Sequence, residues 1–270
     1  MNSGRQVVLQ AFCLVVLAGG WIESGLGRAR ADATTLSARE IAERVVRPDA
    51  LGWGGGRARV RMVLTDSAGK ARERVMDVMG RKKDGKFQSI MRFLNPADVA
   101  GTAFLVLERS SEESEQYIYL PGLKRTRRIA GSEREGSFMG SDFAYADMQG
   151  VDSKQATHVR LADEKVGTEA CYVIESTTER SSKVPYARIV TWARQSDYIA
   201  LRTKFYDRAG RLAKTLYARR IKNVDGRLVV VEARMQNEQV VHATDLFIDS
   251  FERRDDLADT QFTPSALEHL

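Results

Sequence analysis

Cysteine and histidine are both scarce in this sequence. The 270 residues contain two cysteines, Cys13 and Cys171, too few for the framework of a disulfide-stabilised small domain. The three histidines, His158, His242 and His269, stand far apart, and none is spaced from another histidine, a cysteine or a carboxylate as metal ligands are. The motifs of nucleophile elbows, phosphate-binding loops and zinc proteases are missing as well. We therefore expect no metal, no cofactor and no enzymatic activity.

A strong excess of one charge is also missing. The chain has 42 lysines and arginines against 36 acidic residues, a formal net charge of +6, and the acidic residues are spread among the basic ones. Because nucleic-acid-binding proteins gather their basic residues on one face, we expect no nucleic-acid partner. Only 5 prolines occur, and 43% of the residues are hydrophobic against 29% charged, which is typical of a folded globular chain.

No apolar run is long enough to cross a membrane as a helix. The longest extends from Val7 to Gly19, about 13 residues, whereas a membrane-spanning helix needs about 20. Residues 29–31, Ala-Arg-Ala, place small side chains at the two positions that a signal peptidase reads. We predict that residues 1–31 are a signal peptide cleaved near Ala31, with a retained membrane anchor as the alternative. The protein would then be periplasmic.

Removal of this leader would leave one domain, residues 32–270, with Cys171 as its one cysteine. An intramolecular disulfide would then be impossible. Because Cys171 lies in an apolar, strand-like segment, residues 170–174, we interpret it as a small buried hydrophobic residue and not as a reactive thiol.

The first segment after the leader carries the signals of a helix N-terminus. Ser37 and Glu40 have the spacing of a capping box, and Leu36 and Ile41 that of a hydrophobic staple. A proline follows shortly afterwards. The sequence predicts a helix over residues 37–47.

The rest of the chain has the period of β-strands. Apolar residues occupy alternate positions over residues 57–64, as in a strand with one buried face. Segments 66–69, 207–210 and 223–226 begin with Asp or Asn and end with Gly, as type I turns do. The short spacing predicts an antiparallel meander. The predicted strands are 57–65, 72–79, 86–94, 103–109, 116–120, 123–129, 155–162, 169–177, 186–193, 198–206, 211–221, 227–236 and 239–249.

An antiparallel sheet with so many strands must curl, because strands twist. We predict an α+β, mainly β fold: a strongly curved antiparallel sheet, an unclosed β-barrel, whose concave face is covered by helices. The helical segments expected are 37–47, one near 141–150 and a short C-terminal turn after Pro264. Such a covered sheet can enclose an apolar ligand cavity.

One strand breaks the alternation with positive charge on both faces. Lys124, Arg125, Arg127 and Arg128 follow a tight turn at residues 121–122. This cationic patch could bind an anionic headgroup, a carboxylate or a membrane partner. The alternative is a short edge strand that its charges protect from aggregation. The sequence favours neither.

The loop that follows is rich in large apolar residues, which either line a cavity or form plain core. Together with apolar residues of the early strands, they make up a candidate lipid-binding cavity. The candidate lining residues are Met62, Leu64, Phe87, Met91, Phe93, Tyr117, Tyr119, Phe138, Met139 and Phe143.

Four segments resemble one known family. Residues 120–128 and 137–143, and with them 95–103 and 256–263, are similar to the LolA-like outer-membrane lipoprotein-sorting proteins, a family of exported bacterial proteins. This resemblance implies an unclosed antiparallel barrel over lid helices, with an apolar pocket that shields acyl chains in the periplasm.

Two functions from different classes remain open. The first is a monomeric periplasmic carrier that binds lipid or lipoprotein acyl chains in its cavity and transports them toward the outer membrane. The second is an adaptor that carries nothing and docks through the cationic patch on an inner-membrane transporter that exports lipid. A continuous apolar cavity under a helix would favour the carrier, and a packed core the adaptor.

Overall fold

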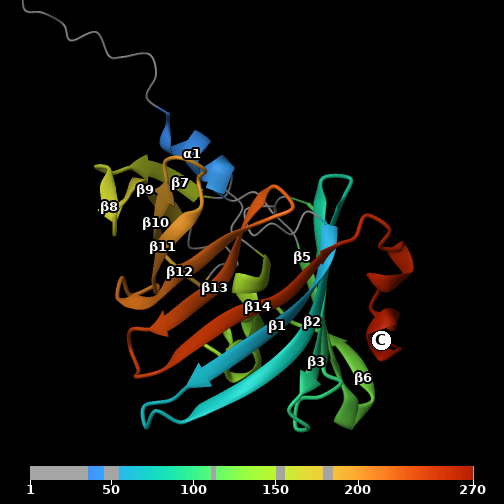
Figure 1. Ribbon diagram of the computed structural model, residues 1–270. Helices are drawn as coiled ribbons and strands as arrows, with labels where there is room; N and C mark the ends of the chain where they lie inside the picture. Colours follow the sequence, from blue (N-terminus) through green and yellow to red (C-terminus); the bar gives the residue numbers. More distant parts are fainter. Residues whose placement is uncertain (1–35, 46–54, 111–113, 150–155, 179–184, 270) are drawn as a thin grey trace, which may run out of the picture. The chain divides into compact units, whose positions relative to one another are not determined.

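One antiparallel sheet makes up most of the computed structural model, which describes residues 36–45, 55–110, 114–149, 156–178 and 185–269 (Figure 1). The predicted signal peptide, Cys13 and the end of the predicted first helix lie outside these residues. The strands are β1 (Gly55–Thr65), β2 (Ala71–Lys83), β3 (Lys86–Asn95), β4 (Ala103–Glu108), β5 (Ser114–Leu120), β6 (Arg125–Arg128), β7 (Ala156–Arg160), β8 (Glu164–Val166), β9 (Glu169–Thr178), β10 (Arg188–Arg194), β11 (Ala200–Tyr206), β12 (Leu212–Val224), β13 (Arg227–Asn237) and β14 (Ala243–Arg253).

The barrel is open because the two strands at the ends of the strand order do not pair with each other. This order runs β6-β5-β4-β3-β2-β1-β14-β13-β12-β11-β10-β9-β7, with β8 paired to β9 beside this path. The first and last strands of the chain are therefore neighbours in the middle of the sheet, and β6 and β7 stand at its two edges. The predicted unclosed, mainly β barrel is confirmed.

Tight turns connect the strands where the sequence predicts them. Asp66 accepts hydrogen bonds from the amides of Ala68 and Lys70, and Asp207 holds the next such turn in the same way. The third predicted turn is tighter than expected. Asp225 and Gly226 alone connect β12 to β13, both at positive φ, which matches the twist of a hairpin better than a type I turn does.

Every predicted strand is present, although several boundaries differ and one further strand occurs. The last strand begins at Ala243 and not at residue 239, because the Asn237 side chain accepts hydrogen bonds from the amides of Gln239 and Val240 and folds them into the hairpin tip. The three-residue strand β8 was not predicted, since it is too short to show alternation.

Helix α1 (Ala38–Val45) covers one end of the sheet. Its predicted capping box is confirmed: the Ser37 amide donates to the Glu40 carboxylate at 2.8 Å, and the Glu40 amide donates to Ser37 Oγ at 3.2 Å. Ile41 is fully buried and packs with Ile174 of β9 and Ala193 of β10. The staple residue Leu36 lies against the same cluster.

The helix predicted near 141–150 is wrong as an α-helix. The chain forms two short 3₁₀ turns there, Phe138–Gly140 and Tyr145–Gln149. Gly140 lies at φ 75°, and the Ser141 hydroxyl donates to the Phe138 carbonyl, so the first turn ends at once. We call residues 137–148 the plug, and the face of the sheet that packs against it the inner face.

The C-terminal segment covers part of the opposite, outer face. Phe262 and Leu267 are buried against Ile90 of β3 and Leu105 of β4. The predicted C-terminal turn is confirmed as the 3₁₀ turn Ser265–Glu268. None of the helices in the described part of the chain has the length and apolar character required to span a bilayer.

Candidate functional site

The inner face of β1–β5, the apolar wall, is lined mainly by hydrophobic side chains. Ser89 and Gln116 are the buried polar side chains among its described residues. The residues that form one cluster here are Ala58, Val60, Met62, Leu64, Met76, Val78, Met91, Phe93, Phe104, Val106 and Ile118.

The plug fills the space in front of this wall with aromatic rings. Phe138 is 0% exposed, and its ring centroid lies 5.9 Å from that of Phe93 and 5.2 Å from that of Phe104. Tyr145 of the plug lies 5.4 Å from Phe138. These tilted and edge-on contacts are typical of a packed core. They stabilise the plug in addition to the burial of its apolar surface.

Most of the predicted lining residues come together here. Met62, Leu64, Met91, Phe93, Phe138, Met139 and Phe143 belong to this one cluster. Phe87 is on the same face of β3, farther along and close to Gly80.

Tyr117 and Tyr119 are not part of the lining, contrary to expectation. They pack against the C-terminal segment on the outer face, because Ile118 between them points inward. Alternation along β5 can place only one of the two sets inside.

The inner face of β9–β14, the mixed wall, has a different composition. Direct pairing places Thr191, Thr203 and Leu216 in one row with Met235 and Thr244. Paired residues share a face, and Met235 belongs to the inner cluster, so the threonines also face inward. The buried polar side chains of this wall are Ser176, Thr178, Thr191, Thr203, Lys214 and Thr244.

Lys214 forms a buried ion pair with the plug. Its side chain is 8% exposed, and its ammonium contacts the carboxylate of Asp147, which is 9% exposed, and donates to the Asp142 carbonyl at 3.1 Å. The hydroxyl of Tyr186 donates to the other Asp147 oxygen at 2.8 Å. Burial and the Asp147 carboxylate raise the pKa of Tyr186 far above its usual value, so the phenol remains a donor.

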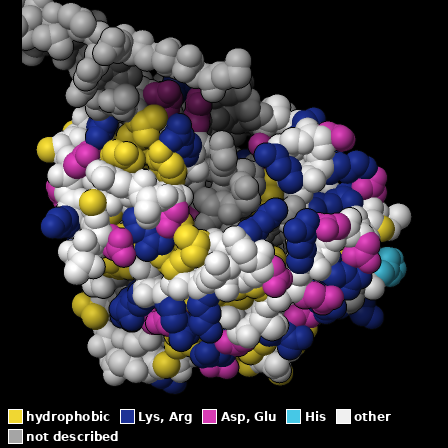
Figure 2. All heavy atoms as spheres, turned by 45° about the horizontal axis from the view of Figure 1, so that its top comes forward, with side chains coloured by type: hydrophobic (Ala, Val, Ile, Leu, Met, Phe, Trp, Pro, Cys, Tyr) yellow, Lys and Arg dark blue, Asp and Glu magenta, His cyan; other side chains and the backbone are white. Residues whose placement is uncertain are grey.

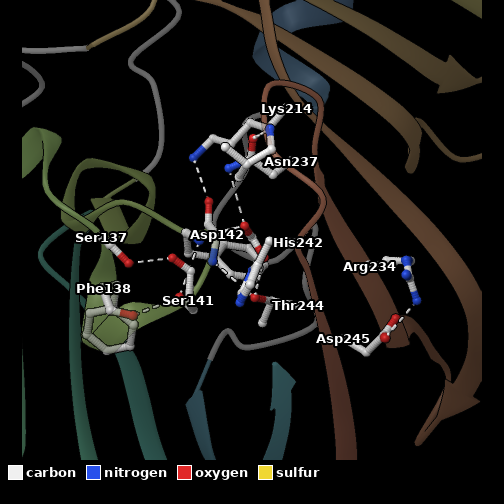
Figure 3. Close-up of polar contacts among 12 residues, drawn as sticks. Ser137, Phe138, Ser141, Asp142, Lys214, Arg234, Asn237, His242, Thr244 and Asp245 are labelled. Atoms are coloured by element: carbon white, nitrogen blue, oxygen red, sulfur yellow. Dashed lines mark hydrogen bonds and ion pairs between the residues drawn. The ribbon is translucent and has the colours of Figure 1, made fainter. Parts of the chain in front are cut away.

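A second polar contact lies beside the first (Figure 3). The Asp142 carboxylate, 3% exposed, binds His242 Nδ1 and the Thr244 hydroxyl, each at 2.7 Å, and the Asn237 amide at 3.4 Å. The Asp142 amide in turn donates to Thr244 Oγ1 at 3.0 Å. The figure shows Lys214, Asn237 and Thr244 of the strands, and His242 of the connection between β13 and β14, converging on this one residue of the plug.

Two polar side chains of the opposite wall also bind the plug. Gln116 donates to the Tyr145 carbonyl at 2.9 Å, and Arg74 donates to the Met139 carbonyl. Burial lowers the pKa of Arg74. Polar groups on both walls therefore hold the plug in place.

The cationic patch lies on an edge strand, as one of the two interpretations had it. All four basic residues are exposed; Arg127 pairs with Glu133 at 2.7 Å and Arg128 with Glu115 at 3.4 Å. The adjoining Leu123 is 71% exposed. Half of the patch is thus neutralised by carboxylates of its own chain.

The outer face carries intermingled charges. Asp77 binds both Arg57 and Arg59, at 2.7 and 2.5 Å, and Arg61 binds Asp249 at 3.3 Å. Figure 2 shows basic and acidic side chains side by side over the face it displays, with hydrophobic ones in separate small patches. Such an arrangement is typical of a solvated surface.

Cys171 belongs to a further hydrophobic cluster, together with Val173 and Trp192. Cys171 is free and buried, as predicted, and burial raises the pKa of its thiol. Within the described ranges, no three His, Cys, Asp or Glu side chains are grouped so that they could hold a metal ion.

Sequence reasoning missed the charged residues of the interior: Asp142, Asp147, Lys214 and His242. A signal was available for one of them. Lys214 stands between Leu212 and Leu216 at a spacing of two, in phase with these apolar residues of its strand. Asp142 and His242 are far apart in the sequence, and only the fold brings them together.

Known proteins share this architecture. A family model described as an uncharacterized protein matches residues 85–269. A crystal structure of a domain assigned to outer membrane lipoprotein sorting, from Vibrio parahaemolyticus, is 30% identical over 86% of this chain and 98% of its own, with a TM-score of 0.79. A DUF1329 family protein from Desulfovibrio piger is 29% identical over 86% and 100%, also with a TM-score of 0.79.

A more distant structure has the same fold. A LolA superfamily protein from Nitrosomonas europaea is 21% identical over 85% of this chain and 98% of its own, with a TM-score of 0.68. None of the curated proteins matches the chain.

Proposed function

The chain belongs to the LolA-like family of outer-membrane lipoprotein-sorting proteins, and from this premise we propose that it is a periplasmic carrier of lipid or lipoprotein acyl chains. It is exported by the signal peptide of residues 1–31, acts as a monomer, and moves its cargo toward the outer membrane. Its role is binding and not catalysis. Acyl chains lie along the apolar wall.

The apolar wall is the observation that supports this proposal most. Its side chains form one continuous hydrophobic cluster across five neighbouring strands. Burial of an acyl chain yields about 0.8 kcal/mol per methylene, so such a wall can hold a long chain without directional bonds.

Loading requires the plug to move, because Phe138 and Phe143 occupy the space in front of the wall. The plug is a short stretch of 3₁₀ turns, not a strand of the sheet, so it can leave without breaking the strand ladder. An acyl chain would then replace the aromatic side chains against the same wall.

The test is to purify the protein from its native host, extract it with organic solvent and identify bound lipid by mass spectrometry. A fluorescent fatty-acyl probe measures binding in parallel. Protein that is consistently empty and does not bind the probe would overturn the proposal.

A matched pair of substitutions locates the cargo. Met91→Gln places a polar group on the apolar wall, and Met79→Gln does the same at a half-buried position on the outer face of the adjacent strand. We expect the first to weaken probe binding several-fold and the second to leave it unchanged. Equal effects would place the probe elsewhere.

The adaptor function is the second candidate, supported by the dense packing of the plug and by the exposed Lys124 and Arg125. Reversing both charges to Glu should abolish association with an inner-membrane transporter in a pull-down and leave probe binding intact. Reversal of Lys82 and Lys86, at the hairpin between β2 and β3, is the control. An undiminished pull-down of the Lys124/Arg125 variant would contradict the adaptor.

A further inference from the structure

Lys214 is the ionisable side chain that the described strands bury most deeply on the inner face, where it is 8% exposed, whereas Arg74 of β2 is only half-buried. An ammonium without a partner is costly to bury, whereas a paired one is tolerated. The partner of Lys214 therefore affects whether the interior is stable with the plug in place or with the plug displaced.

Both oxygen partners of this ammonium belong to the plug. They are the Asp147 carboxylate and the Asp142 carbonyl. Two aromatic rings lie close to it, with the ring centroids of Tyr186 and Phe205 5.0 and 5.5 Å away, and Asn237 of β13 is its direct pairing partner. If the plug leaves, none of these three residues supplies a negative charge, and cation–π contact compensates poorly for the lost ion pair.

We propose that Lys214 binds the anionic headgroup of the cargo, and that the Asp147 carboxylate occupies the headgroup position while the plug is in place. This inference rests on the carrier function proposed above and names its substrate class: acyl lipids that carry a carboxylate or a phosphate. A neutral lipid would displace the plug and leave a buried ammonium unpaired.

The contrast between the two walls gives this cargo an orientation. Its acyl chain lies on the apolar wall, and its oxyanion lies on the mixed wall, where Tyr186 already donates a hydrogen bond to the oxyanion of Asp147. Thr203 and Thr191 continue this polar surface across β11 and β10. An amphipathic lipid matches both surfaces at once.

The test compares three ligands of equal chain length by calorimetric titration of the purified protein: hexadecanoate, hexadecyl phosphate and hexadecanol. A charged hydrogen bond retained in a buried site corresponds to about tenfold or more in affinity, so we expect both anions to bind at least tenfold more tightly than the alcohol. The order of the two anions separates the sources, because tighter phosphate binding indicates a phospholipid and tighter carboxylate binding a fatty acid.

Two variants address the residues directly. Lys214→Met should reduce the affinity for both anions to that for the alcohol, while Lys222→Met, at an exposed lysine of the same strand, should leave the preference intact. Asp147→Asn removes the competing carboxylate and keeps the shape of the plug. It should bind anions more tightly than the wild type does, and hexadecanoate should raise its melting temperature by more.

The outcomes separate this inference from the carrier function. If no ligand binds, the carrier function itself fails. If the alcohol binds as tightly as the anions, or if Lys214→Met keeps the preference, cargo is carried without recognition of a headgroup and this inference is overturned. Should Lys214→Met fold poorly, the gain expected for Asp147→Asn still decides, since an unchanged anion affinity there contradicts the proposal.

Discussion

The two walls of the interior hold the same plug by different means. The apolar wall packs against it with rings and aliphatic side chains, and Gln116 and Arg74 each add a hydrogen bond to a plug carbonyl. The mixed wall binds the two carboxylates of the plug with an ammonium, an imidazole and hydroxyls.

This difference separates affinity from selectivity. Hydrophobic contact is non-directional and accepts any ligand of sufficient apolar area. Buried polar groups must be satisfied, so they discriminate between ligands that can and cannot pair with them. In the proposed carrier, the apolar wall would supply the stability of the closed state, and the mixed wall would decide what can replace the plug.

The largest effect should come from the apolar wall. Phe104→Ala removes a fully buried ring and should lower the free energy of unfolding by about 3–5 kcal/mol, measured by urea denaturation. Phe247→Ala on the outer face, where the ring is half-buried under Arg61, should cost about 1 kcal/mol. Similar losses at the two positions would show that the wall is not the main source of stability.

The ion pair of the mixed wall should come next. Lys214→Met and Asp147→Asn each leave one buried group without its charged partner and should cost about 3 kcal/mol. The double variant leaves no unpaired charge, so its loss should be well below the sum of the two. A double-mutant cycle measures this coupling, and additive losses would mean that the two charges act independently.

A single hydroxyl should matter less. Thr244→Val removes one donor to the Asp142 carboxylate at nearly constant volume and should cost about 1–3 kcal/mol. Thr203→Val, on the same wall, is the control and should cost less than about 1 kcal/mol. Both losses can be measured as decreases in melting temperature. If the two decreases are equal, the hydrogen bond to the plug contributes nothing to stability beyond the burial of the side chain.

The smallest effect should lie outside both walls, in the turn between β11 and β12. Hydrogen bonds from the Gln239 side chain and the Arg211 amide lower the pKa of Asp207 from 3.8 to about 2. A lowered folded-state pKa contributes stability that is present above the unfolded value and is lost as the pH falls through the folded one. The wild type should therefore have a higher melting temperature than Asp207→Asn at neutral pH. This difference in melting temperature should decrease as the pH falls from about 3.8 to about 2. A difference independent of pH would contradict this assignment.

Alternation and turn chemistry were sufficient to predict nearly the whole sheet. Each inward position of β1 follows from its period of two, and Asp66 and Asp207 mark their turns by local hydrogen bonds. These are interactions between residues close in sequence, so the sequence alone can reveal them.

The plug could not be predicted in the same way. Its apolar residues were identified as lining or core, but its charged residues act through partners on distant strands, such as Asp147 with Lys214. Tyr117 and Tyr119 were assigned to the wrong side because both faces of β5 are buried, and the C-terminal segment that covers the second face is remote in sequence. Burial on both sides removes the difference on which alternation depends.

The pairing of β1 with β14 also determines when the sheet can be completed during synthesis of the chain. Apart from the short β8, all other neighbours in the sheet are consecutive strands, so the hairpins from β1 to β6 and from β7 to β14 can form as the chain emerges. The central ladder, in which Gly56 lies opposite Arg253, must wait for almost the last residues. During synthesis, the side of β1 that faces β14 therefore remains an unpaired edge, and β14 is the strand that joins the two halves into a single sheet.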